Sequence, residues 1–137
     1  MDLASGRRSK VLVGLAVIAG LYWLAMFVGT HIPIRTTPTG DPYSLDKLEH
    51  ITAFGLLAAL LCGIGAACRV TAWKLFVGVF GTIAVYGMLD ETTQALVSQR
   101  NADVFDWLAD VVGAAVGIAA FAIVRRLRVR SGSTSGR

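Results

Sequence analysis

The chain has 137 residues, of which 55% are hydrophobic and 16% are charged, and its formal net charge is +4. A soluble domain usually carries about 25% charged residues, so this composition excludes an ordinary soluble enzyme and a disordered chain. Two cysteines are too few for a disulfide scaffold, and the length allows one domain at most. The apolar residues fall in four long blocks, which indicates an integral membrane protein.

The four blocks predict an all-α fold, a bundle of four transmembrane helices. A bilayer core about 30 Å thick requires about 20 apolar residues per helix. The predicted spans cover residues 11–29, 51–68, 72–89 and 104–124, between a basic N-terminal segment, 1–10, and a basic, flexible tail, 125–137. The first block is longer than the apolar core of a typical signal peptide and lacks a clear cleavage site after it. We therefore expect it to be a retained helix.

The charged residues predict the orientation of the bundle. Ten of the thirteen Lys and Arg residues fall in the two termini and in the 69–74 loop, whereas eight of the nine Asp and Glu residues fall at the opposite end. Because Lys and Arg mark the cytoplasmic side of membrane proteins, both termini are expected in the cytoplasm. The basic charge is thus interpreted as an orientation signal, and no nucleic-acid partner is predicted.

Three polar clusters lie near the outer ends of the predicted spans. They are Asp46, Lys47 and His50 before the second span, Glu91 and Gln94 after the third, and Arg100, Asp103, Asp106 and Asp110 at the start of the fourth. Residues three or four apart share a helix face, and the acidic row of the fourth span continues into Gly113 and Gly117. Ionisable groups at membrane depth usually face the bundle interior or water. Three such clusters at one depth predict a functional site.

Several of these residues also have simpler explanations. Lys47 could extend its side chain to the membrane interface, and Asp103 could cap the last helix. Arg100 could only neutralise a neighbouring Asp, and His50 could be a satisfied interfacial histidine. For His31 the sequence offers no partner at helical spacing, so an interfacial position is expected. The pair Gly113 and Gly117 favours close packing between helices of the same chain.

At these positions the chain resembles the VanZ-like family. The resemblance covers residues 46 to about 120 and rests on Asp46-Lys47-x-x-His50-x-x-x-Phe54, Tyr86-Gly87-x-x-x-Glu91-x-x-Gln94, Arg100-x-x-Asp103-x-x-Asp106 and the Gly113–Gly117 pair. The chain departs from the family at Asp110, where Asn followed by Gly is more common. One member of the family gives low-level resistance to the glycopeptide teicoplanin. The resemblance implies a small protein of the bacterial cytoplasmic membrane with a polar site at the outer leaflet, and it implies no particular reaction.

Two classes of function fit the polar site. In an enzyme for a cell-envelope lipid or lipid-linked precursor, His50 would transfer protons. The catalytic residues would be His50, Asp46, Glu91 and Asp106, and the substrate would be bound by Lys47, Gln94, Arg100, Asp103 and Asp110. Asp46 would orient His50, while Lys47 and Arg100 would hold a phosphate head group. In a binder or scaffold without turnover, the same residues would hold a head group, a glycopeptide or a partner membrane protein.

Other functions receive less support from the sequence. No catalytic Ser–His–Asp spacing or zinc-protease motif is visible, and no cofactor is predicted, although His50, Glu91 and Asp106 could hold a divalent metal ion. A transporter would be expected to carry a charged group near mid-membrane, whereas these charges gather at one end. The substrate and the oligomeric state are left open.

Overall fold

A computed structural model describes residues 3–32, 42–97 and 102–134 of the chain. This part of the chain contains four helices, which are α1 (Leu3–Thr30), α2 (Pro42–Ala67), α3 (Ala72–Gln94) and α4 (Val104–Thr134). Each of them includes a stretch of at least 23 residues that is long and apolar enough to cross a membrane. The predicted all-α bundle of four transmembrane helices is therefore confirmed, and the protein is a multi-pass membrane protein.

Each helix extends beyond the predicted span by several residues at one of its ends. α1 begins at Leu3 within the basic N-terminal segment, α2 begins at Pro42, and α3 continues to Gln94. α4 continues without a break to Thr134, so residues 125–134, which were predicted to belong to a flexible tail, are helical. Hydropathy marks only the part of a helix that lipid surrounds. The polar turns continue the same backbone hydrogen bonding, but because they are not apolar, the sequence placed them outside the predicted spans.

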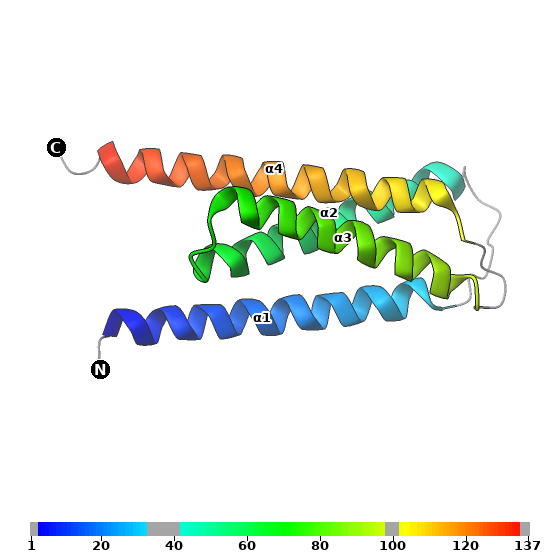
Figure 1. Cartoon of the computed structure of the whole chain (residues 1–137), viewed down its shortest axis with the longest axis horizontal. Coiled ribbons are helices and arrows are strands. Elements are labelled where there is room, and N and C mark those ends of the chain that lie inside the picture. Colours follow the sequence, from blue (N-terminus) through cyan, green and yellow to red (C-terminus); the bar gives the residue numbers. More distant parts are fainter. Residues whose placement is uncertain (1–2, 33–41, 98–101, 135–137) are drawn as a thin grey trace.

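The helices run along the long axis of the molecule, with both termini and the turn between α2 and α3 at the same end (Figure 1). The end of α1, the start of α2, the end of α3 and the start of α4 lie at the opposite end. With the exception of Lys47, the basic and acidic residues of the described chain are thus separated along the bundle. Which end faces the cytoplasm stays a prediction.

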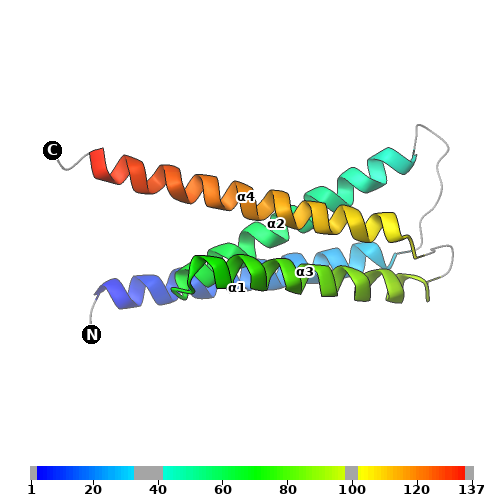
Figure 2. The same ribbon diagram turned by 45° about the horizontal axis from the view of Figure 1, so that its top comes forward.

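Helices α2 and α4 cross each other and form the most extensive contact in the bundle (Figure 2). Glycines line this crossing. A Cβ atom on Gly117 would lie 2.8 Å from the carbonyl carbon of Gly55, and one on Gly113 would lie 3.0 Å from the Cα atom of Ile51. Both separations leave no room for a side chain, so the predicted packing of these glycines within the chain is confirmed. The close approach brings the polar residues of the two helices into contact.

Helix α1 is the least embedded of the four. It contacts α2 and, to a small extent, α3, and within the described residues it does not contact α4. Only 6% of the residues in its apolar stretch are buried, compared with 22% to 28% in the other helices. Hydrogen bonds to α2 hold it at two points. Tyr22 Oη donates to the carbonyl oxygen of Ala53 (3.0 Å), and Arg8 donates to that of Ala67 through Nε (2.9 Å) and Nη2. Most of α1 is therefore available to lipid.

Candidate functional site

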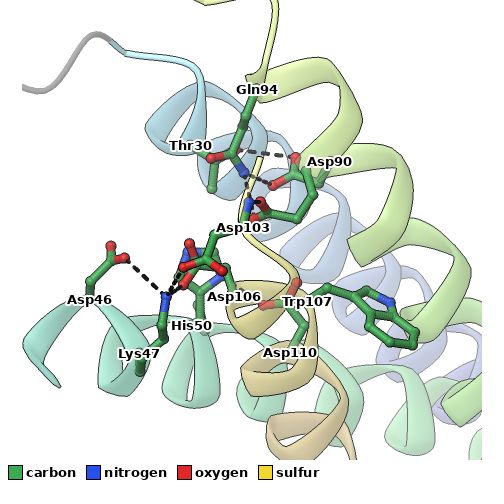
Figure 3. A network of polar contacts seen from close by, with 12 residues as sticks. Thr30, Asp46, Lys47, His50, Asp90, Gln94, Asp103, Asp106, Trp107 and Asp110 are labelled. Carbon is green, nitrogen blue, oxygen red and sulfur yellow. Dashed lines mark hydrogen bonds and ion pairs between the residues drawn. The ribbon is translucent and has the colours of Figure 1, made fainter. Parts of the chain in front are cut away.

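Lys47 joins α2 to the start of α4. Its Nζ atom donates hydrogen bonds to Oδ2 of Asp103 (2.9 Å) and to Oδ1 of Asp106, and it lies 3.8 Å from Oδ2 of Asp46 (Figure 3). The Lys47 side chain is 17% exposed. It therefore points into the bundle rather than to the membrane interface.

Asp103 combines three contacts at the N-terminus of α4. Its Oδ1 atom accepts the N–H of Phe105 (2.8 Å), which is the capping interaction considered from the sequence, and Oδ2 accepts a hydrogen bond from Lys47. Its own N–H donates to Oε2 of Glu91 on α3 (2.9 Å). The hydrogen bond from Lys47, followed by that from Phe105, lowers the pKa of the Asp103 carboxyl below its usual value. Asp103 is therefore ionised, and it ties three helices together.

The second pair across α2 and α4 is His50 with Asp110. His50 Nδ1 and Asp110 Oδ1 are 2.7 Å apart, and the two side chains are 7% and 0% exposed. An ionised carboxylate only accepts hydrogen bonds, so with ionised Asp110 the Nδ1–H donates and Nε2 is left for another partner. Asp110 Oδ2 has no hydrogen-bond partner among the described residues. Asp110 thus fixes the orientation of the His50 ring.

Helix α3 contributes three buried polar side chains. Gln94 Nε2 donates to Oδ2 of Asp90 (2.7 Å) and, over a longer distance, to Oε1 of Glu91 (3.4 Å). Asp90 is 1% exposed, Gln94 3% and Glu91 5%. Asp90 Oδ1 also accepts the hydroxyl of Tyr86 (3.4 Å). This row of polar residues closes the site on the α3 side.

The structure also brings α1 to the site, which the sequence did not predict. The Thr30 hydroxyl donates to Oδ1 of Asp90 (3.2 Å), and His31 Nδ1 lies 4.0 Å from the same oxygen. His31 Nε2 is 3.0 Å from the Thr93 hydroxyl. His31 therefore has a partner on another helix, which helical spacing could not predict, and its Nδ1 atom also lies 2.8 Å from the carbonyl oxygen of Phe27. Its expected interfacial position stays a prediction. The sequence did contain one signal for Asp90. It lies four residues from both Tyr86 and Gln94, so the three share a helix face, which indicates that Asp90 faces the bundle.

A cavity of about 230 Å³ opens beside His50, between α1 and α2. Its wall comprises Met26, Gly29 and Thr30 of α1 and Asp46, Glu49, His50, Ala53 and Phe54 of α2. A wider cavity of about 550 Å³ shares Glu49 and Ala53 with it and is also lined by Tyr22, Leu45, Leu48 and Thr52. Carboxylates and an imidazole contribute polar groups to this space, and apolar side chains line most of the rest. The shape and polarity fit an amphiphilic molecule.

Most of the predicted site residues come together at one end of the bundle. Asp46, Lys47, His50, Glu91, Gln94, Asp103, Asp106 and Asp110 all belong to the network just described or border it, whereas Arg100 lies outside the described residues. The sequence assigned the orientation of His50 to Asp46, but the structure places Asp110 on Nδ1. Helical spacing reports neighbours on one helix and not partners across two. The catalytic and binding roles themselves stay predictions.

Two sets of side chains have the composition and spacing of a metal site. One is Asp46, His50 and Asp106, and the other is His50, Glu91 and Asp110; in each set, one ligand atom per residue lies within 4.8 Å of the others. The set considered from the sequence, His50 with Glu91 and Asp106, is divided between the two. Asp106 is held toward Lys47, so Asp110 takes its place beside Glu91.

Comparison with known proteins places the chain in a family. A family model described as VanZ/LLP1 matches residues 7–125, which include most of all four helices. The match extends over α1, which the motif-based resemblance did not cover. Searches of curated proteins and of solved structures found no match.

Proposed function

The chain belongs to the VanZ/LLP1 family, and we propose from this membership and the geometry of the site that it binds an amphiphilic molecule of the cell envelope and acts on its polar head group through His50. The bound molecule would be a membrane lipid or a lipid-linked precursor. The observation that carries the proposal is the position of His50. Its ring lines the cavity between α1 and α2, and its Nδ1 atom is held by the fully buried Asp110.

The two cavities support an amphiphilic ligand. Polar groups come from Asp46, Glu49 and His50, while Phe54, Leu45 and Leu48 offer apolar surface. Because α1 is the least buried helix and packs loosely, a lipid could enter sideways from the bilayer without leaving it. In this arrangement the acyl chain lies along the seam between α1 and α2, and the head group reaches His50.

The charges around the cavity favour a particular kind of head group. Lys47 already pairs with Asp103 and Asp106, so it would have to give up an ion pair to hold a phosphate. Two carboxylates, Asp46 and Glu49, face the cavity instead. A head group that carries hydroxyls or an amine, such as a sugar or an aminoalcohol, would donate hydrogen bonds to them. We therefore propose recognition of the donor-rich part of the head group.

The pair of His50 and Asp110 supports an acid–base role. A carboxylate on Nδ1 fixes the tautomer and ring position of a histidine, which leaves Nε2 to exchange a proton with a bound molecule. His50 is the proposed catalytic residue, and Asp110 is a positioning residue that acts through it. Glu91 and Asp106 lie close enough to influence the charge on His50. We further propose that glycopeptide resistance would follow if the protein changes or sequesters an envelope lipid in this way.

The alternative is a scaffold without turnover. The pairs that Lys47 forms with Asp103 and Asp106 join α2 to α4, and such a network would stabilise the bundle or a docking surface whether or not a lipid is bound. This alternative explains the network on α2 and α4 but gives no purpose to the cavity beside His50. The two functions differ in whether the cavity is occupied and whether its ligand is transformed.

Occupancy of the cavity is tested with lipids that co-purify with the protein. The chain is extracted in polymer nanodiscs, and its lipids are compared by mass spectrometry with those of the surrounding membrane. We expect one lipid class to be enriched in the wild type and lost in Ala53→Trp, which fills the cavity. The matched control, Ala16→Trp on the exposed face of α1, should retain it. Equal lipid profiles in the wild type and Ala53→Trp would contradict the proposed binding.

A further inference from the structure

Three buried side chains meet on the α3 side of His50. They are His50 of α2, Glu91 of α3 and Asp110 of α4, with exposed fractions of 7%, 5% and 0%. One ligand atom from each lies within 4.8 Å of the other two. We propose that these three residues bind one divalent transition-metal ion.

The first argument is the charge of the cluster. Within the described residues neither Glu91 nor Asp110 contacts a lysine or an arginine, because Lys47 is engaged by Asp103 and Asp106. A protonated His50 would compensate one of the two buried carboxylates. The other would still require a cation or a proton, since an unpaired buried charge is strongly unfavourable. A divalent ion would compensate both carboxylates at once.

The second argument is the unpaired oxygen of Asp110. Oδ2 is buried and has no hydrogen-bond partner in the described part of the chain. It faces α3 at Gly87, where a Cβ atom would lie only 2.7 Å from it. Gly87 is one helical turn before Glu91. The oxygen therefore points to the α3 side, where Glu91 lies, and a buried carboxylate oxygen in this position requires a partner.

The neighbouring acidic set is a poorer metal site. In the set of Asp46, His50 and Asp106, the ammonium group of Lys47 already binds Asp106 and lies 3.8 Å from Asp46. A metal ion there would have to displace this cation or approach it closely. No lysine competes for the set of His50, Glu91 and Asp110 within the described residues. The two ligands from α2 and α4 are also held in fixed positions by the close helix crossing at Gly55, Gly113 and Gly117.

The ligand types indicate which ion would bind. One imidazole with two carboxylates suits Mn²⁺, Fe²⁺ or Zn²⁺, whereas Mg²⁺ prefers a shell of oxygen atoms that includes several waters. The inference rests on the proposed function in one respect, which is that the ion would engage the head group that reaches His50. While the ion is bound, the His50 nitrogen that holds it would not transfer protons. Binding of the ion itself can be measured without any lipid.

The test uses the purified full-length chain after treatment with a chelator. The protein is titrated with Zn²⁺, Mn²⁺ and Mg²⁺, and the retained metal is measured by mass spectrometry after gel filtration, together with the thermal midpoint. We expect one Zn²⁺ or Mn²⁺ ion per chain, a midpoint that rises with ion concentration, and weaker binding of Mg²⁺. Glu91→Gln and Asp110→Asn should each weaken binding by at least about tenfold.

Charge-matched controls keep the result interpretable. Glu49→Gln and Asp103→Asn remove carboxylates near the site but outside the proposed set, so they should retain the ion. If Asp110→Asn does not fold, Glu91→Gln decides. Absence of stoichiometric ion in the wild type, or equal loss in the controls, would overturn the inference. The two proposals can be tested independently. Lipid enrichment in the ion-free protein would support the proposed function without the metal site. Ion binding without lipid enrichment would support the metal site without the proposed function.

Discussion

Asp103 shows how a single side chain at the membrane boundary links three helices. Its carboxylate caps α4 and accepts a hydrogen bond from Lys47 of α2, while its backbone N–H reaches Glu91 of α3. The contacts from Lys47 and Phe105 favour an ionised carboxylate. They also place the charge just before the first residue of the helix, where the helix dipole favours a negative group.

The lowered pKa of Asp103 predicts a pH-dependent contribution to stability. The Lys47 hydrogen bond lowers the pKa of the folded carboxyl below its usual value of 3.8, so the stabilisation is present above that value and is lost as the pH falls through the lower, folded pKa. Below about pH 4, the thermal midpoint of the wild type should therefore fall more steeply than that of Asp103→Asn. Parallel midpoint curves for the two proteins in detergent would contradict this account.

The sequence revealed the residues of the site better than their partners. The ends of the apolar blocks correctly placed His50, Glu91 and Asp106 at one end of the bundle, and spacing of three or four residues indicated the helix face of each. The contact between His50 and Asp110 depends on the crossing of α2 and α4, and no local pattern specifies which residues meet there. Thr30 and His31 were missed for the same reason, since their partners lie on α3.

At the scale of elements, the crossing of α2 and α4 determines where the site forms. Gly55, Gly113 and Gly117 allow the two backbones to touch, and the ion pairs from Lys47 and His50 follow one or two turns closer to the helix ends. The sequence predicted both the helices and the glycine contact. It did not predict the full helix lengths, because charged turns such as Arg125–Arg130 continue α4 without contributing to hydropathy.

Substitution of Gly117 by Ala should separate α2 from α4. The new methyl group would lie 2.8 Å from the carbonyl carbon of Gly55, and because backbone atoms cannot rotate away, the variant should lose about 1–3 kcal/mol of stability. The matched control is Gly81→Ala on α3, where nothing lies within 4 Å of the added atom. Thermal unfolding in detergent measures both. Equal midpoints for Gly117→Ala and Gly81→Ala would show that the crossing is not tightly packed.

At the scale of the whole molecule, charge is distributed along the bundle axis. Basic residues occupy the end with the two termini and the turn after α2, while the acidic site occupies the opposite end (Figure 1). The positive-inside rule then predicts that the site faces the exterior of the cytoplasmic membrane. In this orientation the cavity opens toward the outer leaflet.

The two native cysteines test this orientation without an engineered label. Cys68 is exposed after the end of α2, whereas Cys62 is fully buried. A membrane-impermeant maleimide should therefore label Cys68 in inverted vesicles and not in intact spheroplasts, and Cys68→Ser should remove the signal. Labelling of Cys68 from the outside of spheroplasts would place the polar site on the cytoplasmic face and contradict the predicted orientation.

The central claim, that His50 acts on an envelope lipid, is tested most directly by comparing lipid extracts from cells that express the wild type or His50→Ala. Both proteins must be inserted at equal abundance, which is checked by immunoblotting of the membrane fraction. We predict a lipid-soluble species that appears or disappears only with the wild type, and its mass difference would identify the reaction. Identical extracts from the two strains would contradict an acid–base role for His50 and favour the scaffold.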